Sequence, residues 1–416
     1  MPVSAVRQIS LIVAILVTSG IGCDVAVDQF PANDVFSLTL ARARSVPADA
    51  ANNDANAVVT SLFGTPDKPQ WPSSWLDDEA FADLVEAENL VRAAGPVSSE
   101  EDGTHLGLFR EHCVTCHGVA GDGAGPASAT QNPYPRDFRH GVFKWKSSER
   151  GDKPTRGDLI SLLKHGVPGT GMPAFTLLAD EDIEALADYV IYLSVRGEFE
   201  RRLMAAAIDQ LDYAETAPSD EAKLTLNSGT EGEKVVHDVL NRVVRDWGQA
   251  QPVDVPRMYR ELQGESLSES IMRGDKIFHG PIANCVGCHG SNGNGQAVTL
   301  DYDDWTKEYS TRLGLDPKDR DAMRPFRKAG ALRPRTVQPR NLKQGVFRGG
   351  SEPETLYRRI TQGIAGTPMP AVAVVEEPNG VGLTDDQIWD LVRYLRAAAM
   401  PEPRSADGED KLGEEK

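Results

Sequence analysis

Two five-residue stretches, "CVTCH" at 113–117 and "CVGCH" at 285–289, carry four of the 5 cysteines in this 416-residue chain. Each stretch ends in a histidine that directly follows its second cysteine. C-x-x-C-H is the pattern of covalent haem attachment, in which two thiols form thioethers with the haem and the adjacent histidine binds the iron. The pattern therefore predicts a haem at each of the two places.

A zinc site is the alternative interpretation of the two motifs. Structural zinc is bound tetrahedrally by four Cys or His side chains from nearby pairs. A histidine beside its own cysteine suits one tetrahedral ion poorly, and the two motifs are far apart in the chain. We therefore favour two covalently bound haem c groups. The predicted attachment residues are Cys113, Cys116, Cys285 and Cys288, with His117 and His289 on the iron.

The residues after each motif repeat in the same order, which indicates two copies of one structural unit. "PRDF" at 135–138 returns as "PRNL" at 339–342. "DLISLLKHGVPGTGMPAF" at 158–175 returns as "TLYRRITQGIAGTPMPAV" at 355–372. The second copy is longer, and its extra residues lie mostly at 296–338.

Each copy closes with a predicted amphipathic helix, so we expect a mainly α fold. Apolar residues recur at i, i+3, i+4 and i+7 in both copies, which places them on one helix face. They are Ile183, Leu186, Ala187 and Val190 in the first copy and Ile388, Leu391, Val392 and Leu395 in the second. Thr384 and Gln387 have the spacing of a capping box at the start of the second helix.

Met172 in "GTGMP" and Met369 in "GTPMP" are the predicted sixth iron ligands. A thioether is a soft ligand, and paired His and Met ligands are typical of cytochromes that transfer electrons. The alternative for either residue alone is an ordinary core methionine. Because both stand in one repeated context, we favour iron ligation.

Arg136 and Arg340 occupy equivalent Pro-Arg turns between the haem motif and the methionine. Arginine suits a bidentate carboxylate partner, and haem carries two propionates. Each arginine is therefore a candidate propionate ligand, with an ordinary surface arginine as the alternative. Residues 134–156 around the first arginine hold seven Lys or Arg and three Asp or Glu, which indicates either a docking face or a solvated loop.

The N-terminus has the pattern of an export signal. Arg7 precedes an apolar run at 9–17. That run is too short to span a bilayer, which needs about 20 apolar residues. Cys23 follows Gly22 directly, as in a lipoprotein signal, although Gly20 stands where such signals usually carry Leu. Two outcomes stay open: lipidation of Cys23 with membrane attachment, or ordinary cleavage nearby. Either one predicts a protein that is periplasmic or anchored facing the periplasm.

Composition divides the rest of the chain. The net charge of −18 argues against nucleic acid as a partner, because phosphate binding needs clustered Lys and Arg. Residues 24–96, rich in Ala, Asp, Asn and Pro, predict a tether with one short helix near 78–93; packing on a domain through Trp71 and Trp75 is the alternative. The expected segments are a signal (1–23), the tether (24–96), domain one (97–200), a helical connector (201–265), domain two (266–402) and a disordered acidic tail (403–416).

Both copies resemble the domains of class I c-type cytochromes. The resemblance covers the CxxCH motif, the Met loop, and the first and last helices, which carry Phe109 and Tyr189 in one copy and Phe278 and Tyr394 in the other. It implies two tandem helical domains whose terminal helices cross with these aromatic rings in contact. The glycine that the family usually has four residues before the helix phenylalanine is present as Gly274 but is replaced by His105 in copy one.

The resemblance extends to cytochrome subunits of bacterial respiratory and anaerobic oxidoreductase complexes. It implies an electron carrier that relays single electrons between redox proteins or serves a membrane respiratory complex. Two alternatives stay open. One is a dihaem enzyme, such as a peroxidase, which needs an iron with an open site, or a thiosulfate-oxidising cytochrome, which needs a further cysteine. The other is a subunit built permanently into a respiratory complex.

Overall fold

The computed structural model describes residues 27–399 except 214–217, 256–258, 297–299 and 379. Within these ranges the fold is mainly α-helical, and its paired strands are two residues long, which confirms the expected fold class. The export segment with Cys23 and the acidic tail lie outside the described residues. In the described part of the chain, no helix combines the length and apolar character that crossing a bilayer requires.

The first repeat is built around one long helix, α7 (Asp180–Gln210). Every α7 residue from Ala185 to Glu200 is buried, because other elements pack on all sides of the helix. The predicted apolar face of this helix is confirmed. The shorter elements are β1 (Ser98–Ser99), β2 (His105–Leu106), α4 (Leu108–His112), α5 (Val114–His117), η3 (Ser128–Thr130), η4 (Phe138–His140) and α6 (Arg156–His165).

The segment before the first repeat is folded, so the expectation of a tether is wrong for residues 27–96. Its elements are α1 (Asp34–Arg44), α2 (Asp49–Phe63), η1 (Ser73–Trp75), η2 (Glu79–Phe81) and α3 (Ala87–Ala93). Helix α2 buries a stripe of alanines and larger apolar residues against α7. Trp71 meets Phe63 edge-on with ring centroids 6.1 Å apart, and the Trp75 carbonyl accepts a hydrogen bond from Asn241 (3.0 Å). The larger apolar residues of α2 lie on its buried face, although the Asp, Asn and Pro residues of the segment give it the composition of a tether.

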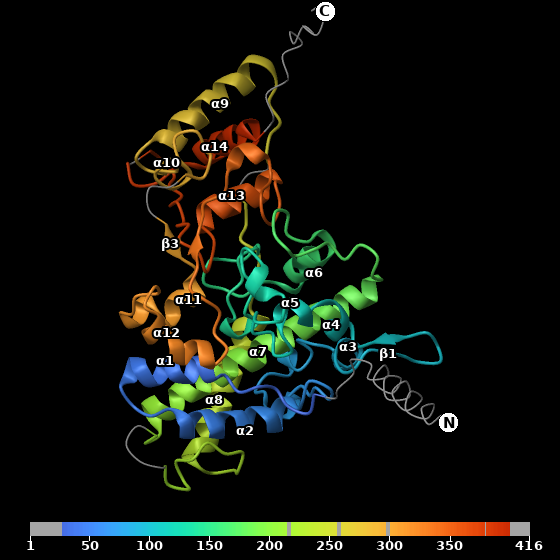
Figure 1. The fold of residues 1–416 in the computed structure, drawn as a ribbon. Helices are drawn as coiled ribbons and strands as arrows, with labels where there is room; N and C mark the ends of the chain where they lie inside the picture. The colour runs from blue at the N-terminus through green and yellow to red at the C-terminus, as the bar shows by residue number, and fades with distance from the viewer. Residues whose placement is uncertain (1–26, 214–217, 256–258, 297–299, 379, 400–416) are drawn as a thin grey trace, which may run out of the picture.

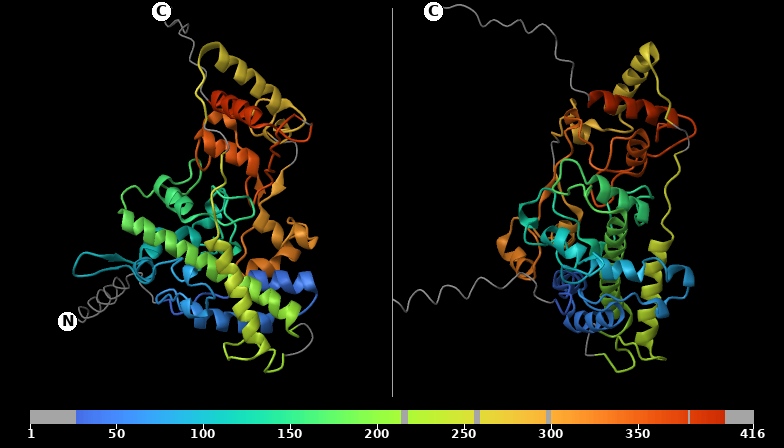
Figure 2. Two further views of the ribbon diagram at one scale, coloured as in Figure 1. Left: turned by 180° about the vertical axis from the view of Figure 1, so that it is seen from behind. Right: turned by 90° about the vertical axis from the view of Figure 1, so that its right-hand side faces the viewer.

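Helix α8 (Glu231–Gly248), between the repeats, packs on α7 and buries Val236, Leu240, Val243 and Val244. Figures 1 and 2 show α1, α2 and α8 together at one end of the molecule, with α9 and α14 of the second repeat at the other end.

The second repeat is a smaller helical unit with its own core. Its elements are α9 (Gly264–His279), α10 (Val286–His289), η6 (Leu342–Gln344), α13 (Pro353–Gln362) and α14 (Asp385–Ala398). The predicted capping box at the start of α14 is confirmed.

The terminal helices of each repeat meet through their aromatic residues, as the family resemblance implies. Ring centroids lie 5.0 Å apart for Phe109 and Tyr189 and 5.3 Å apart for Phe278 and Tyr394. Gly274 permits the close crossing of α9 and α14, because a Cβ there would lie 2.2 Å from the Asp390 carbonyl oxygen. In the first repeat the position of this glycine lies outside the helix, in β2, so the crossing helix shrinks to α4.

The extra residues of the second repeat form a separate lobe. Its elements are β3 (Asp301–Tyr302), α11 (Asp304–Glu308), η5 (Thr311–Leu313), α12 (Arg320–Lys328) and β4 (Thr336–Val337). Met323 and Phe326 of α12 are buried in a small core that Val35 of α1 joins. Figure 1 shows α11 and α12 beside α1 and away from α9 and α14. The insertion of one repeat is therefore packed on the other.

Replacing Gly274 by Ala should destabilise the second repeat by about 1–3 kcal/mol, since the new methyl group would collide with the α14 backbone. Guanidinium unfolding followed by circular dichroism measures the loss. Gly157→Ala is the matched control in α6, where a Cβ would meet only Thr155 Oγ1 at 3.7 Å. Its stability should stay equal or rise by up to about 1 kcal/mol. Equal effects of the two variants would contradict the helix-crossing argument.

Candidate haem sites

Each CxxCH motif folds into one tight helical turn closed by backbone hydrogen bonds. The His117 N–H donates to the Cys113 carbonyl (2.8 Å), and the Cys116 N–H donates to the same oxygen (3.1 Å). His289 donates to the Cys285 carbonyl at the same distance of 2.8 Å. The two motifs therefore have one backbone geometry, which local sequence alone specifies.

Each motif histidine is oriented by a backbone carbonyl of its Pro-Arg turn. His117 Nδ1 lies 3.1 Å from the Arg136 carbonyl oxygen, and His289 Nδ1 lies 3.0 Å from that of Arg340. A carbonyl only accepts, so Nδ1 carries the proton and Nε2 keeps the lone pair that a metal needs. Burial lowers the pKa of His117 to about 4 and also lowers that of His289. Both imidazoles are therefore neutral at physiological pH.

The motif cysteines are free thiols in the described chain. Burial raises the pKa of Cys113 to about 12 and that of Cys285 to about 11. The thiols of Cys113 and Cys285 are therefore protonated, and a protonated thiol is the form that adds across a vinyl group to make a thioether. Among the described residues, no three His, Cys, Asp or Glu side chains are grouped so that they could hold a metal ion.

Two glycines that sequence reasoning missed hold the Pro-Arg turns against the motifs. Gly123 and Gly295 have φ of 69° and 77°, and a Cβ on them would lie 2.7 Å from the Pro135 carbonyl and 2.4 Å from the Pro339 carbonyl. Only glycine allows this contact without strain. The repeated spacing "HGxxGxG" after each motif is the sequence signal that could have found them.

The two methionine loops share their internal hydrogen bonds. The Met172 N–H donates to Thr170 Oγ1 (3.1 Å), and the Met172 carbonyl accepts from the Val167 N–H (3.1 Å). The Met369 N–H donates to Thr367 Oγ1 (3.2 Å) in the same way. Both methionines are half-buried. The repeated "GT-x-MP" sequence thus encodes one loop conformation twice.

The Pro-Arg arginines provide a test of whether the chain suits haem. Arg136 Nη1 and Arg340 Nε are buried and have no hydrogen-bond partner, and the same holds for Arg348 Nε. A cavity of about 450 Å³ lies beside Arg340 and Arg348 and is lined mostly by polar side chains. The single unpartnered Nε atoms of Arg340 and Arg348, beside this cavity, suit the carboxylates of haem propionates, although other nitrogens of both side chains are hydrogen-bonded within the protein. The hydrogen-bond donors of these arginines therefore suit haem, the group that the CxxCH motifs imply.

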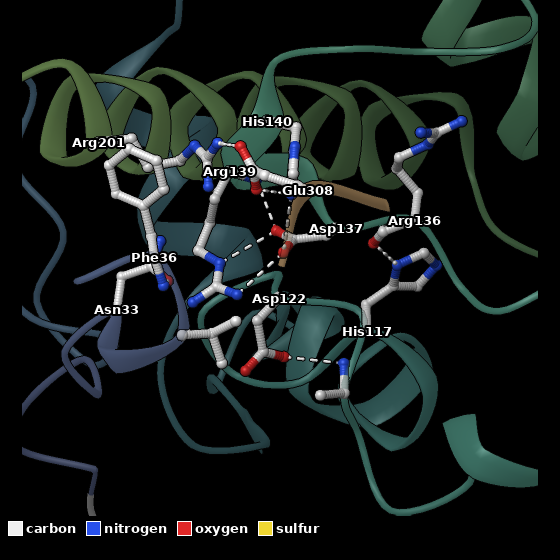
Figure 3. Close-up of polar contacts among 12 residues, drawn as sticks. Asn33, Phe36, His117, Asp122, Arg136, Asp137, Arg139, His140, Arg201 and Glu308 are labelled. Atoms are coloured by element: carbon white, nitrogen blue, oxygen red, sulfur yellow. Dashed lines mark hydrogen bonds and ion pairs between the residues drawn. The ribbon is translucent and has the colours of Figure 1, made fainter. Parts of the chain in front are cut away.

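A charged cluster, in which Arg139 is buried and the other groups are half-buried, lies beside the first Pro-Arg turn (Figure 3). Arg139 makes two hydrogen bonds to the Asp137 carboxylate (3.0 and 2.9 Å). His140 lies 3.6 Å from Asp137 and 3.7 Å from Glu308, and Arg201 pairs with Glu308. Because Glu308 belongs to the insertion of the second repeat, this cluster joins the two repeats.

Further contacts of the insertion cover Arg136. Trp305 is 9% exposed and lies between Arg136 (4.1 Å from the ring centroid) and Lys144 (4.2 Å). Lys144 also pairs with the buried Asp303 (3.2 Å). The basic stretch 134–156 thus turns much of its charge toward the second repeat of the same chain, which neither the docking-face nor the solvated-loop interpretation anticipated.

Family comparisons agree with this geometry. Residues 104–190 match the model of cytochrome c oxidase, cbb3-type, subunit III, and residues 271–399 match that of cytochrome c. The chain is a c-type cytochrome with two cytochrome c domains. Covalently bound haem c follows from membership in this family, and the cytochrome's role is haem-based redox chemistry. Each matched region contains its CxxCH motif.

The assignment to the c-type cytochromes does not depend on relatives among curated proteins or solved structures. No curated protein matches the chain. A solved chain from a reducing HAO-like protein complex of Kuenenia stuttgartiensis is similar at 21% identity and a TM-score of 0.45, covering 73% of this chain and 98% of that one.

Replacing Cys285 and Cys288 together by Ser should leave one covalently bound haem per chain instead of two, because no thioether can form in the second domain. Intact mass of the denatured protein, with the pyridine haemochrome absorbance, counts the attached groups. The Cys113 and Cys116 double variant is the matched control and should also retain one. Two haems retained by either variant would refute the assignment of the attachment residues.

His140→Gln should flatten the fall of stability with decreasing pH. Burial, with Arg201 beside the ring, lowers the pKa of His140 to about 4, below the unfolded value of about 6.5. The stabilisation from neutral His140 is complete above the unfolded pKa. It is lost as pH falls from about 6.5 toward 4, by at most about 1.4 kcal/mol per pH unit. Unfolding free energies of both proteins between pH 7 and 4 test this. Parallel curves would contradict it. Glutamine is the chosen replacement because Gln344 occupies the equivalent position in the second repeat.

Proposed function

We propose that this cytochrome carries two haem c groups, one per domain, and relays single electrons between redox partners outside the cytoplasm. The observation that carries the proposal is the repeated methionine loop, with one set of hydrogen bonds around Met172 and around Met369. A methionine held in the same loop conformation in each domain favours six-coordinate iron in both. Such iron has no open site for a substrate.

The residues of the chain have distinct roles in this proposal. When bound, haem iron supplies the one-electron redox chemistry. The four motif cysteines would hold the group covalently, and His117 and His289 would bind the iron through Nε2. The backbone carbonyls of Arg136 and Arg340 fix the tautomer and direction of each imidazole, and their unpaired guanidinium nitrogens bind propionate carboxylates. Met172 and Met369 would supply a soft thioether ligand that favours the reduced state.

The packing of the two domains supports transfer within one molecule. Contacts from Trp305, Lys144 and Arg201 join the domains through buried groups on both sides. A fixed arrangement keeps the distance between redox centres constant and removes the need for diffusion between them. We propose that one domain receives the electron and the other delivers it to a partner protein or a membrane respiratory complex.

Export to the periplasm is also part of the proposal. Its support is the signal-like sequence before residue 24 and the cytochrome c assignment, since domains of this kind are usually exported. A lipid on Cys23 would place the relay at the membrane surface. Intact-mass analysis of the membrane fraction distinguishes the two forms of the mature protein. An N-terminus beyond residue 23 would rule out the lipid.

Met172→Ala and Met369→Ala should each convert one iron to a centre with an exchangeable site and a lower midpoint potential, because water is a harder ligand than a thioether. Potentiometric titration and cyanide binding measure both effects. Each variant serves as the control for the other, since the unmodified domain should keep its potential. An unchanged titration in either variant would show that the methionine in question is not a ligand. Fast cyanide or peroxide binding to the unmodified protein would favour the dihaem enzyme.

A further inference from the structure

The two methionine loops differ in what holds them from outside, although their internal bonds are alike. Arg150 of the first domain reaches the loop of the second. Its Nη1 donates to the Met369 carbonyl (2.6 Å), and its Nη2 donates to the Thr367 carbonyl (3.0 Å). One guanidinium thus binds two carbonyls of the same loop. One belongs to Met369, the proposed ligand, and the other to Thr367, whose hydroxyl supports the Met369 N–H. A planar, always charged fork fixes both carbonyls in direction as well as distance.

The reverse contact is weaker. Arg348 of the second domain donates one hydrogen bond to the Gly169 carbonyl (3.3 Å), and this bond is exposed. Gly169 precedes Met172 by three residues, so the bond does not reach the backbone of the methionine itself. The Met172 carbonyl accepts from the Val167 N–H of its own loop (3.1 Å). The Met369 carbonyl accepts from the Ile364 N–H in the same way (3.3 Å), so the bonds from Arg150 come in addition to a contact that both loops have. The loop of the second domain therefore depends on its neighbour in a way that the loop of the first does not.

Arg150 is presented by a well-braced loop. The Ser147 N–H donates to Asp158 Oδ1 (3.0 Å), and Ser148 Oγ donates to the Lys153 carbonyl (2.5 Å). Ser147 also accepts through its carbonyl from the Val253 N–H (2.8 Å), in the segment that leads into the second domain. Because both sides of Arg150 are tied to the structure, its guanidinium has a defined position relative to Met369.

We infer that Arg150 is a positioning residue for the iron ligand Met369, acting across the domain boundary. The inference rests on the proposed function, since it needs Met369 on the iron. Fixing the carbonyl of Met369 fixes the peptide plane and with it the direction in which the side chain leaves the backbone. Ligation in the second domain then depends on closed packing of the two domains, whereas ligation in the first does not. Domain packing thereby sets the potential of one centre selectively.

Arg150→Gln in the full haem-loaded chain tests the inference. Glutamine is too short to bridge both carbonyls, so the Met369 loop should loosen. The far-red sulfur-to-iron band of the ferric protein should fall to about half, and only one of the two potentiometric waves should move to lower potential. Arg150→Lys should restore part of the band, because an ammonium group donates to one carbonyl at a time.

Arg335→Gln is the matched control. Arg335 also crosses the domain boundary to backbone carbonyls, those of Gln131 and Ala129, but it touches neither methionine loop. This variant should keep the whole far-red band. Because Arg335 also lines the cavity beside Arg340, the band and not the potentials is the readout of this control. An equal loss in both variants would overturn the inference in favour of general loosening of the interface, and an undiminished band in Arg150→Gln would overturn it outright. A missing second methionine band in the unmodified protein would instead overturn the proposed function, and this inference with it.

Discussion

The hydrogen bond from each motif histidine to the carbonyl of its Pro-Arg turn is the constraint on which the structure depends. It joins two segments that lie far apart in the chain, 19 residues in the first domain and 51 in the second. It sets the tautomer and direction of the imidazole, and it places the arginine side chain at the domain boundary. Gly123 and Gly295 allow this turn to approach the motif, since a side chain at either position would push the backbone of the Pro-Arg turn away from it.

The domain boundary is the second organising feature. An acidic chain would gain little by exposing a basic stretch to solvent, and here the stretch is used internally. Arg136, Lys144 and Arg150 each meet a group of the second domain: an aromatic ring, a carboxylate and a pair of backbone carbonyls. The long insertion of the second domain, with Trp305 and Glu308, covers the first domain on this side. The two domains are thus packed into one unit.

Sequence reasoning succeeded where the determinants are local or repeated. The CxxCH turn, the capping box at Thr384 and the apolar face from Ile183 to Val190 depend on residues within one or two helical turns, and the internal repeat showed which of them matter. It failed for residues 27–96, because the buried stripe of α2, which runs from Ala51 to Phe63, lies in a segment whose Ala, Asp, Asn and Pro content indicates a tether. The roles of Arg150 and Trp305 could not be predicted, since each contacts a partner more than 150 residues away.

The central claim is that both irons are six-coordinate, with a histidine and a methionine each. The most direct measurement is the low-temperature EPR spectrum of the fully oxidised, haem-loaded chain, integrated to count low-spin iron. The account predicts two low-spin centres per chain and no high-spin signal. One high-spin centre would contradict it and would indicate an iron with an open site, as a dihaem enzyme requires.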